Sequence, residues 1–225
     1  MLASIEEIYK NLINAPEKLI PVLISALMVI LIFLPLERMI KSKVSFALGD
    51  DEAETKFSIK RSFDILGVIG VPFSYAAGWS KAIPFRKEKY SNPIKAAFLI
   101  SLSGTAFFVA SAVIVLIGGL IVLIPYAIIT YGAYGDSGFG SEWDIIYYSF
   151  LLLLYRLGLL SVINLLPIPP FNGSLFVASF MNDKLCSRFL KLGKYTRIIL
   201  AILAVFGITD MIMEMLYSMV GNIPI

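Results

Sequence analysis

The chain has 225 residues, of which 58% are hydrophobic and only 16% are charged, and its formal net charge is +3. Soluble domains average about 45–50% apolar and about 25% charged residues, so this composition indicates an integral membrane protein and excludes an ordinary soluble enzyme. The chain contains no histidine, which excludes catalysis by an imidazole base and excludes zinc held by histidine.

The apolar segments predict a single membrane domain, residues 1–225, with an all-α polytopic fold. A spanning helix needs about 20 predominantly apolar residues. Four segments meet this requirement, namely 19–41, 95–125, 144–166 and 197–220. We therefore expect four or more spans.

Two further apolar segments are too irregular to be simple spans. Residues 65–84 are short and rich in Gly and Pro, so we expect a re-entrant segment packed against protein. In residues 164–173, Pro167, Pro169 and Pro170 must break the helix that precedes them. Irregular backbone at membrane depth is stable only where protein or a water-filled cavity satisfies its polar groups. The two segments therefore predict one interior site.

Lysines and arginines concentrate in three segments. Six lie from Arg38 to Arg61, five from Lys81 to Lys95 and five from Lys184 to Arg197, whereas residues 126–155 contain none. The positive-inside rule places the three basic segments in the cytoplasm. Because these residues flank apolar segments, we expect them to contact the lipid bilayer, and we expect no binding of nucleic acid.

Arg156, Asp210 and Glu214 are charged residues within predicted spans. A charge at the centre of a span costs at least about 2.5–3.5 kcal/mol on insertion scales, so a partner is expected. Asp210 and Glu214 are one helical turn apart in the last span, and we expect one of them to form an intramembrane ion pair with Arg156. The alternative is that the three residues form an ion or proton pathway.

The sequence resembles the site-2 protease family in three places. Residues 164–174, NLLPIPPFNGS, resemble the N-x-x-P-x-P-x-x-D-G element that supplies the third zinc ligand in that family. Residues 64–85, DILGVIGVPFSYAAGWSKAIPF, are similar to the family's D-P-x-G and G-W-A-K-P-V-P elements, and SLSGTAFF resembles its A-G-P-x-x-N stretch. The resemblance implies a compact, site-2-protease-like membrane core without a PDZ domain, in a bacterial cytoplasmic membrane.

The chain departs from that family at the zinc site. Family members carry H-E-x-x-H on the first helix, with two histidine ligands and a glutamate base. Aligning LGD at 48–50 places this motif on Glu37 to Lys41, with Arg38 at the base position and Asn172 at the aspartate position. Phe108 falls on the family's substrate-positioning asparagine. Since zinc needs about three His, Cys or carboxylate ligands, we expect neither catalytic nor metal-binding residues, and no cofactor.

Two interpretations of Lys41 remain open. The simpler one is that Glu37, Arg38 and Lys41 end the first span at the lipid head groups, where the i,i+4 pair contributes only a few tenths of a kcal/mol. The second is that the Lys41 ammonium replaces the charge of a metal ion, in which case Lys41 should lie near Asn172.

The resemblance and the missing ligands together predict a catalytically inactive pseudoprotease that is not an enzyme. It would bind or scaffold a transmembrane segment of a partner protein. The predicted groove consists of Asn164, Pro167, Pro169, Gly173 and Phe108. One alternative is an intramembrane metalloprotease with non-standard ligands or with zinc ligands donated by a partner chain. A second alternative is a small ion or solute transporter.

Overall fold

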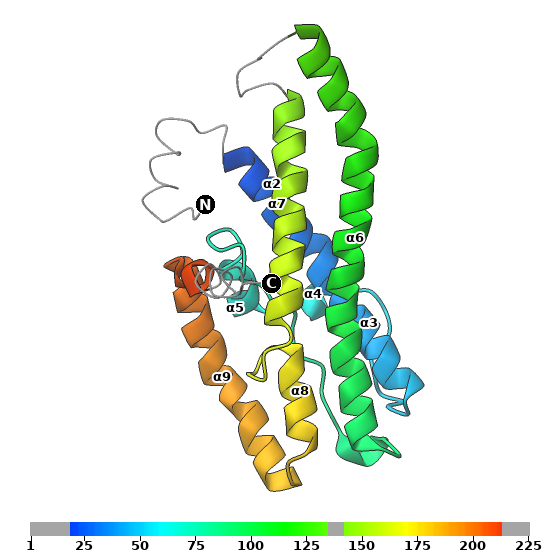
Figure 1. Cartoon of the computed structure of the whole chain (residues 1–225). Coiled ribbons are helices and arrows are strands. Elements are labelled where there is room, and N and C mark those ends of the chain that lie inside the picture. The colour runs from blue at the N-terminus through cyan, green and yellow to red at the C-terminus, as the bar shows by residue number, and fades with distance from the viewer. Residues whose placement is uncertain (1–18, 135–141, 213–225) are drawn as a thin grey trace, which may run out of the picture.

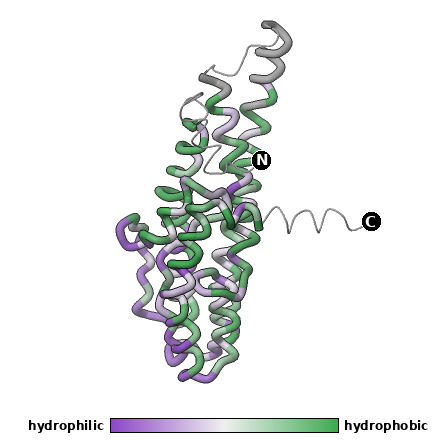
Figure 2. The backbone as a smooth tube through the Cα atoms, turned by 90° about the vertical axis from the view of Figure 1, so that its left-hand side faces the viewer, coloured by the Kyte–Doolittle hydropathy of each residue, from purple (hydrophilic) through white to green (hydrophobic). Residues whose placement is uncertain are grey.

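The structure is a computed structural model that describes residues 19–134 and 142–212. All regular secondary structure in those ranges is helical (Figure 1). Three helices are long and apolar enough to cross a membrane, namely Leu19–Ala47, Pro93–Val122 and Ile145–Ile163. Hydrophilic residues gather towards the lower end of the molecule (Figure 2). These features support a multi-pass integral membrane protein, as the composition predicts.

The first span contains a widened turn. It consists of α2 (Leu19–Met28), the π-helix η2 (Val29–Phe33) and α3 (Leu34–Ala47). Pro35 at the start of α3 has no N–H group, and its ring would clash with the carbonyl four residues earlier in a regular α-helix. A π-turn immediately before it relieves this clash. The span therefore continues as one helix into the α3 turns that carry the candidate site.

Two long antiparallel helices form the centre of the molecule. They are α6 (Pro93–Tyr134) and α7 (Glu142–Ile163), and Figure 1 shows them side by side. Asn92 caps α6, because its side chain accepts a hydrogen bond from Lys95 N at 3.0 Å. The first span packs against both, α2 on α7 and α3 on α6. Their shared core includes the fully buried Val29, Leu34, Phe108, Leu153, Leu157 and Leu160.

The helix break predicted at the prolines is present. After α7 ends at Ile163, residues 164–171 are irregular, and α8 (Asn172–Ser179) then begins. The Pro169–Pro170 peptide bond is cis. This break turns the chain so that α8 packs against both α6 and the following helix.

The last helix differs from the expected span at 197–220. α9 (Asp183–Val205) begins earlier, because the Asn182 side chain caps it by accepting a hydrogen bond from Leu185 N at 2.9 Å. It ends at Val205, and Gly207 follows with a φ of 70°, which favours glycine. Helical structure resumes over 208–212, and residues 213–220 lie outside the described residues.

The segment expected to be re-entrant is largely non-helical. It contains the short helix α5 (Ile65–Ile69), preceded by α4 (Ile59–Ser62), and the 3-10 helix η3 (Lys87–Lys89) follows it. Between α5 and η3 the chain runs through turns and extended backbone, with Val71, Ala76 and Trp79 buried. Because this backbone forms no regular ladder, its polar groups need partners from elsewhere in the protein.

Arg156 and Asp210 supply those partners. Arg156 is 1% exposed, and its Nη1 donates to the carbonyl oxygens of Val71 at 2.7 Å and Ser74 at 3.0 Å. Asp210 accepts from Ala76 N at 2.9 Å and from Ser74 Oγ at 2.8 Å. No salt bridge joins the two residues in the described part of the chain, and Glu214 lies outside it.

The physical reason is the position of the irregular backbone. Arg156 meets buried carbonyl groups of this segment, which attract a cation, and Asp210 meets its buried amide groups, which attract an anion. The guanidinium also lies 4.7 Å from the centre of the Tyr75 ring and donates to Ser25 Oγ at 3.1 Å. Both charges are therefore engaged in holding residues 71–76 against α2, α7 and the segment at 208–212.

Candidate functional site

A buried polar cluster joins the first span, the irregular segment and α8. We call it the Lys41 cluster, and it consists of Glu37, Lys41, Ser80 and Asn172. Lys41 Nζ lies 2.6 Å from Glu37 Oε1 and donates to Asn172 Oδ1 at 2.9 Å. Asn172 Nδ2 donates to Glu37 Oε1 at 3.0 Å, and Ser80 Oγ donates to Glu37 Oε2 at 2.6 Å. The contact expected between Lys41 and Asn172 is therefore present.

Local sequence explains why these side chains meet. Glu37 and Lys41 are four residues apart on α3 and therefore share one face of the helix. Asn172 is the first residue of α8, and its carbonyl accepts a hydrogen bond from Ser101 Oγ at 2.7 Å. Gly104 of α6 lies directly against the cluster, because a Cβ atom there would lie 2.8 Å from Glu37 Oε1. Only a residue without a side chain leaves room for the cluster.

The cluster is internally balanced in charge. Glu37 is 1% exposed and Lys41 is 7% exposed, so neither charge is solvated. One anion faces one cation, and both carboxylate oxygens of Glu37 accept hydrogen bonds. A buried ion pair is stable only when its remaining hydrogen-bonding capacity is satisfied in this way. The interpretation in which these residues merely end the span at the head groups does not agree with their burial.

Arg38 points away from the cluster. Its Nε donates to the carbonyl of Lys81 at 3.2 Å, and its Nη1 lies 3.6 Å from Glu54. Arg38 is 8% exposed and lines a cavity of about 350 Å³ that residues 81–84 and Arg86 also line. The Arg38 side chain therefore faces the polar residues at 50–54 and 81–86, and not the Lys41 cluster.

That polar region is held together by ion pairs. Asp50 accepts a hydrogen bond from Arg86 Nη2 at 2.9 Å, and Asp51 accepts one from Lys89 Nζ at 2.8 Å. The hydrogen bond from Lys89 holds the pKa of the Asp51 carboxyl below its ordinary value. Burial raises the pKa of the Tyr90 phenol, which lies 2.7 Å from Ser45 Oγ. These pairs tie the end of α3 to the start of α6.

A cavity of about 310 Å³ opens beside the Lys41 cluster. Lys41 and Asn172 form part of its wall, residues 82–85 form a second wall, and Pro169 to Phe171 form a third. Leu190 and Gly193 of α9 complete it. The cavity therefore lies between the two irregular segments, where the sequence predicts an interior site.

The residues predicted to form the groove do not all line this cavity. Pro169 lines the cavity, whereas Pro167 is exposed and does not. Asn164 and Gly173 shape the proline-rich turn: Gly173 N donates to Asn164 O at 2.9 Å, and Asn164 Nδ2 donates to Leu160 O at 2.8 Å. The side-chain amide of Asn164 is therefore engaged with the end of α7.

Phe108 was expected in the groove, and the structure corrects this prediction. Its side chain is 1% exposed and packs in the core formed by α2, α3, α6 and α7. The aromatic ring of Phe108 follows the ordinary preference of a large apolar side chain for close packing. It does not reach the cavity beside the Lys41 cluster.

The donor set of the cluster does not suit the zinc ion that the resemblance implies. Glu37 is the one carboxylate, Asn172 offers a neutral amide oxygen, and the Lys41 ammonium has no lone pair to donate. No group of three His, Cys, Asp or Glu side chains close enough to hold a metal ion occurs among the described residues. The cluster holds an ammonium group at its centre instead.

Sequence reasoning missed two members of the site. Ser80 follows Trp79 in an irregular segment, where no periodicity predicts which way a side chain points. Gly104 lies within an apolar helix, and only its approach to the cluster explains it.

Comparison of the chain with protein-family models, with characterised proteins and with solved structures finds no match. The resemblance to the site-2 proteases therefore rests on the sequence motifs quoted above.

Proposed function

We propose that this chain is a catalytically inactive, site-2-protease-like membrane protein that binds a transmembrane segment of a partner protein. One observation carries the proposal: Lys41 Nζ is held between Glu37 Oε1 at 2.6 Å and Asn172 Oδ1 at 2.9 Å. The resemblance assigns zinc ligands to these same three positions. Their side chains converge, and a covalently attached cation stands in for the positive charge of a metal ion.

The cation explains how such a core would persist without a metal. If the ammonium were absent, the carboxylate of Glu37 would be buried and uncompensated, which is strongly unfavourable. Lys41 supplies the counter-charge but cannot activate water as a metal ion does. The substitution therefore preserves the architecture and removes the hydrolytic chemistry.

Partner binding is supported by the cavity beside the cluster. Its volume of about 310 Å³ suits a few side chains or one unwound turn of a partner, not a whole helix. Its walls combine the apolar Ile83, Phe85 and Leu175 with the polar Lys41 and Asn172. In a site of low dielectric, hydrogen bonds from an unwound segment are stronger than they are in water. The membrane concerned is a bacterial cytoplasmic membrane, with the basic segments on the cytoplasmic side.

Site-specific photocrosslinking tests this proposal. A photoreactive amino acid is placed at Ile83 or Leu175, which line the cavity, in the full chain in its native membrane. The matched control is Ile114 of α6, which is 69% exposed on an apolar face. We expect a discrete protein adduct at Ile83 and Leu175 that is absent at Ile114, and mass spectrometry should identify a membrane protein in it. Adducts of the same protein at all three positions, or at none, would contradict the proposal.

A further inference from the structure

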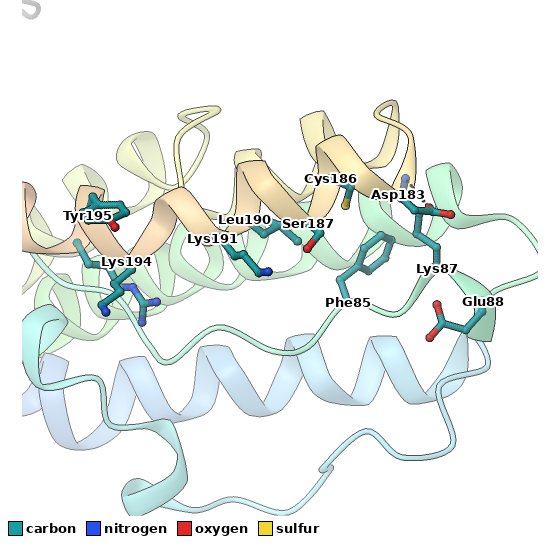
Figure 3. Close-up of a pocket in the computed structure, with 11 residues that line it drawn as sticks. Phe85, Lys87, Glu88, Asp183, Cys186, Ser187, Leu190, Lys191, Lys194 and Tyr195 are labelled. Carbon is teal, nitrogen blue, oxygen red and sulfur yellow. Dashed lines mark ion pairs between the residues drawn. The ribbon is translucent and has the colours of Figure 1, made fainter.

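A large cleft lies away from the Lys41 cluster. It has a volume of about 760 Å³ and lies between α9 and residues 85–88 (Figure 3). Phe85, Cys186 and Leu190 line it together with several charged side chains. Nothing in the proposed function accounts for it.

The two ends of the cleft are held by interactions within the chain. Lys87 Nζ donates to the carbonyl of Met181 and lies 3.6 Å from Asp183. Arg197 Nη1 donates to Asp64 at 3.0 Å, and its Nε donates to Gly193 O at 2.8 Å. These contacts fix the walls in place, so the cleft does not need to form when a ligand arrives.

Two cations in the cleft remain unpaired. Lys191 and Lys194 form no hydrogen bond or ion pair with any other described residue. They are three residues apart on α9 and therefore lie on the same side of the helix. Figure 3 shows both ammonium groups pointing into the space between α9 and the segment that carries Phe85. Two free ammonium groups aimed at one space are suited to a phosphate.

The outer surface of α9 beside these lysines is apolar. Leu192, Tyr195 and Ile199 are 53%, 64% and 55% exposed, and their spacing places them along one stripe of the helix. Tyrosine is enriched at the boundary between lipid and water. The same helix thus presents a cationic cleft next to an apolar stripe, a combination typical of helices that lie at an anionic membrane surface.

We propose that this cleft binds the head group of an anionic glycerophospholipid. Lys191 and Lys194 would donate to the phosphate oxygens, and the acyl chains would lie along Leu192 and Ile199. Glu88 lies at the far end of the cleft, beside Lys87 (Figure 3). The Glu88 carboxylate would accept hydrogen bonds from the hydroxyl groups of a glycerol head group and would repel a second phosphate. A head group with one phosphate at the two lysines and a glycerol at Glu88 therefore suits the cleft.

The test uses the purified full chain in a zwitterionic detergent. Short-chain phosphatidylglycerol, short-chain phosphatidylcholine and glycerol phosphate are each titrated, and bound ligand is counted by native mass spectrometry. The test variant is Lys191→Gln with Lys194→Gln. The control variant is Lys184→Gln with Arg188→Gln, which removes the same charge from exposed positions of the same helix outside the cleft. Far-ultraviolet circular dichroism verifies that both variants fold.

We expect phosphatidylglycerol to bind the original chain and the control variant equally, and to bind the test variant about 30-fold more weakly. Equal binding to the test variant, or equal binding of phosphatidylcholine, would overturn the site. Glycerol phosphate binding as tightly as the lipid would show that the cleft takes a soluble phosphate and would overturn the lipid assignment.

Discussion

Replacing Lys41 by methionine tests whether its ammonium compensates the buried Glu37. Methionine keeps most of the apolar stem and removes the charge 2.6 Å from Glu37 Oε1. Removing one partner of a buried ion pair costs about 3–5 kcal/mol of unfolding free energy. Because Asn172 Nδ2 and Ser80 Oγ still donate to Glu37, we expect the lower end, about 3 kcal/mol.

A second substitution separates charge from packing. Adding Glu37→Gln to Lys41→Met removes the uncompensated charge and keeps an oxygen that accepts hydrogen bonds. We expect the double variant to recover to within about 1 kcal/mol of the original chain, since neutral replacements of buried ion pairs are often tolerated. A loss of the same size in the single and double variants would instead indicate lost packing.

The assay is unfolding in mixed micelles with increasing sodium dodecyl sulfate, followed by far-ultraviolet circular dichroism. The control is Lys43→Met, an exposed lysine on the same helix, for which we expect a change within about 0.5 kcal/mol. If Lys41→Met were as stable as Lys43→Met, the argument that Lys41 replaces the charge of a metal would be refuted.

Three further predictions concern other parts of the molecule. Gly104→Ala should cost about 1–3 kcal/mol in the same assay, because the methyl group would lie 2.8 Å from a carboxylate oxygen of the Lys41 cluster. Gly158→Ala should cost nothing, because no packing neighbour beyond the adjacent helix backbone lies within 4 Å of the added methyl group. Asp210→Asn should speed hydrogen exchange at the Ala76 amide, because a carboxylate that accepts this N–H at 2.9 Å is replaced by a neutral, weaker acceptor; unchanged exchange would contradict this role. The lowered pKa of Asp51 means that its contribution to stability is present above its ordinary pKa and is lost as pH falls through the lowered value. The loop at 49–53 should therefore stay protected from exchange at pH 5 and open only at a pH below the ordinary pKa of an aspartate. Opening of that loop already at pH 6 would show that the pair with Lys89 does not hold it.

The sequence predicted the parts of the fold that depend on composition and on proline. Three of the expected spans are present as long apolar helices, because burial in a membrane requires an uninterrupted apolar stretch. The break after Ile163 is present because proline cannot continue a helix. The approach of Lys41 to Asn172 could be expected because the resemblance to the site-2 proteases places both residues at zinc-ligand positions.

The contacts of the irregular segment could not be predicted in the same way. Opposite charges in spans suggest an ion pair, but Arg156 and Asp210 bind carbonyl and amide groups of residues 71–76 instead. Unpaired backbone has no signature in a sequence, since every residue carries the same donor and acceptor. The break at Gly207 was missed because an apolar run alone does not reveal a residue with positive φ.

Zinc content tests the central claim most directly. The full chain and the variant Glu37→His with Lys41→His and Asn172→Asp are equilibrated with zinc, freed of excess metal and measured by mass spectrometry of the metal. The account predicts negligible zinc in the original chain and about one zinc per chain in the variant, because the variant places two histidines one turn apart opposite an aspartate. Stoichiometric zinc in the original chain would contradict the claim that Lys41 stands in for the metal.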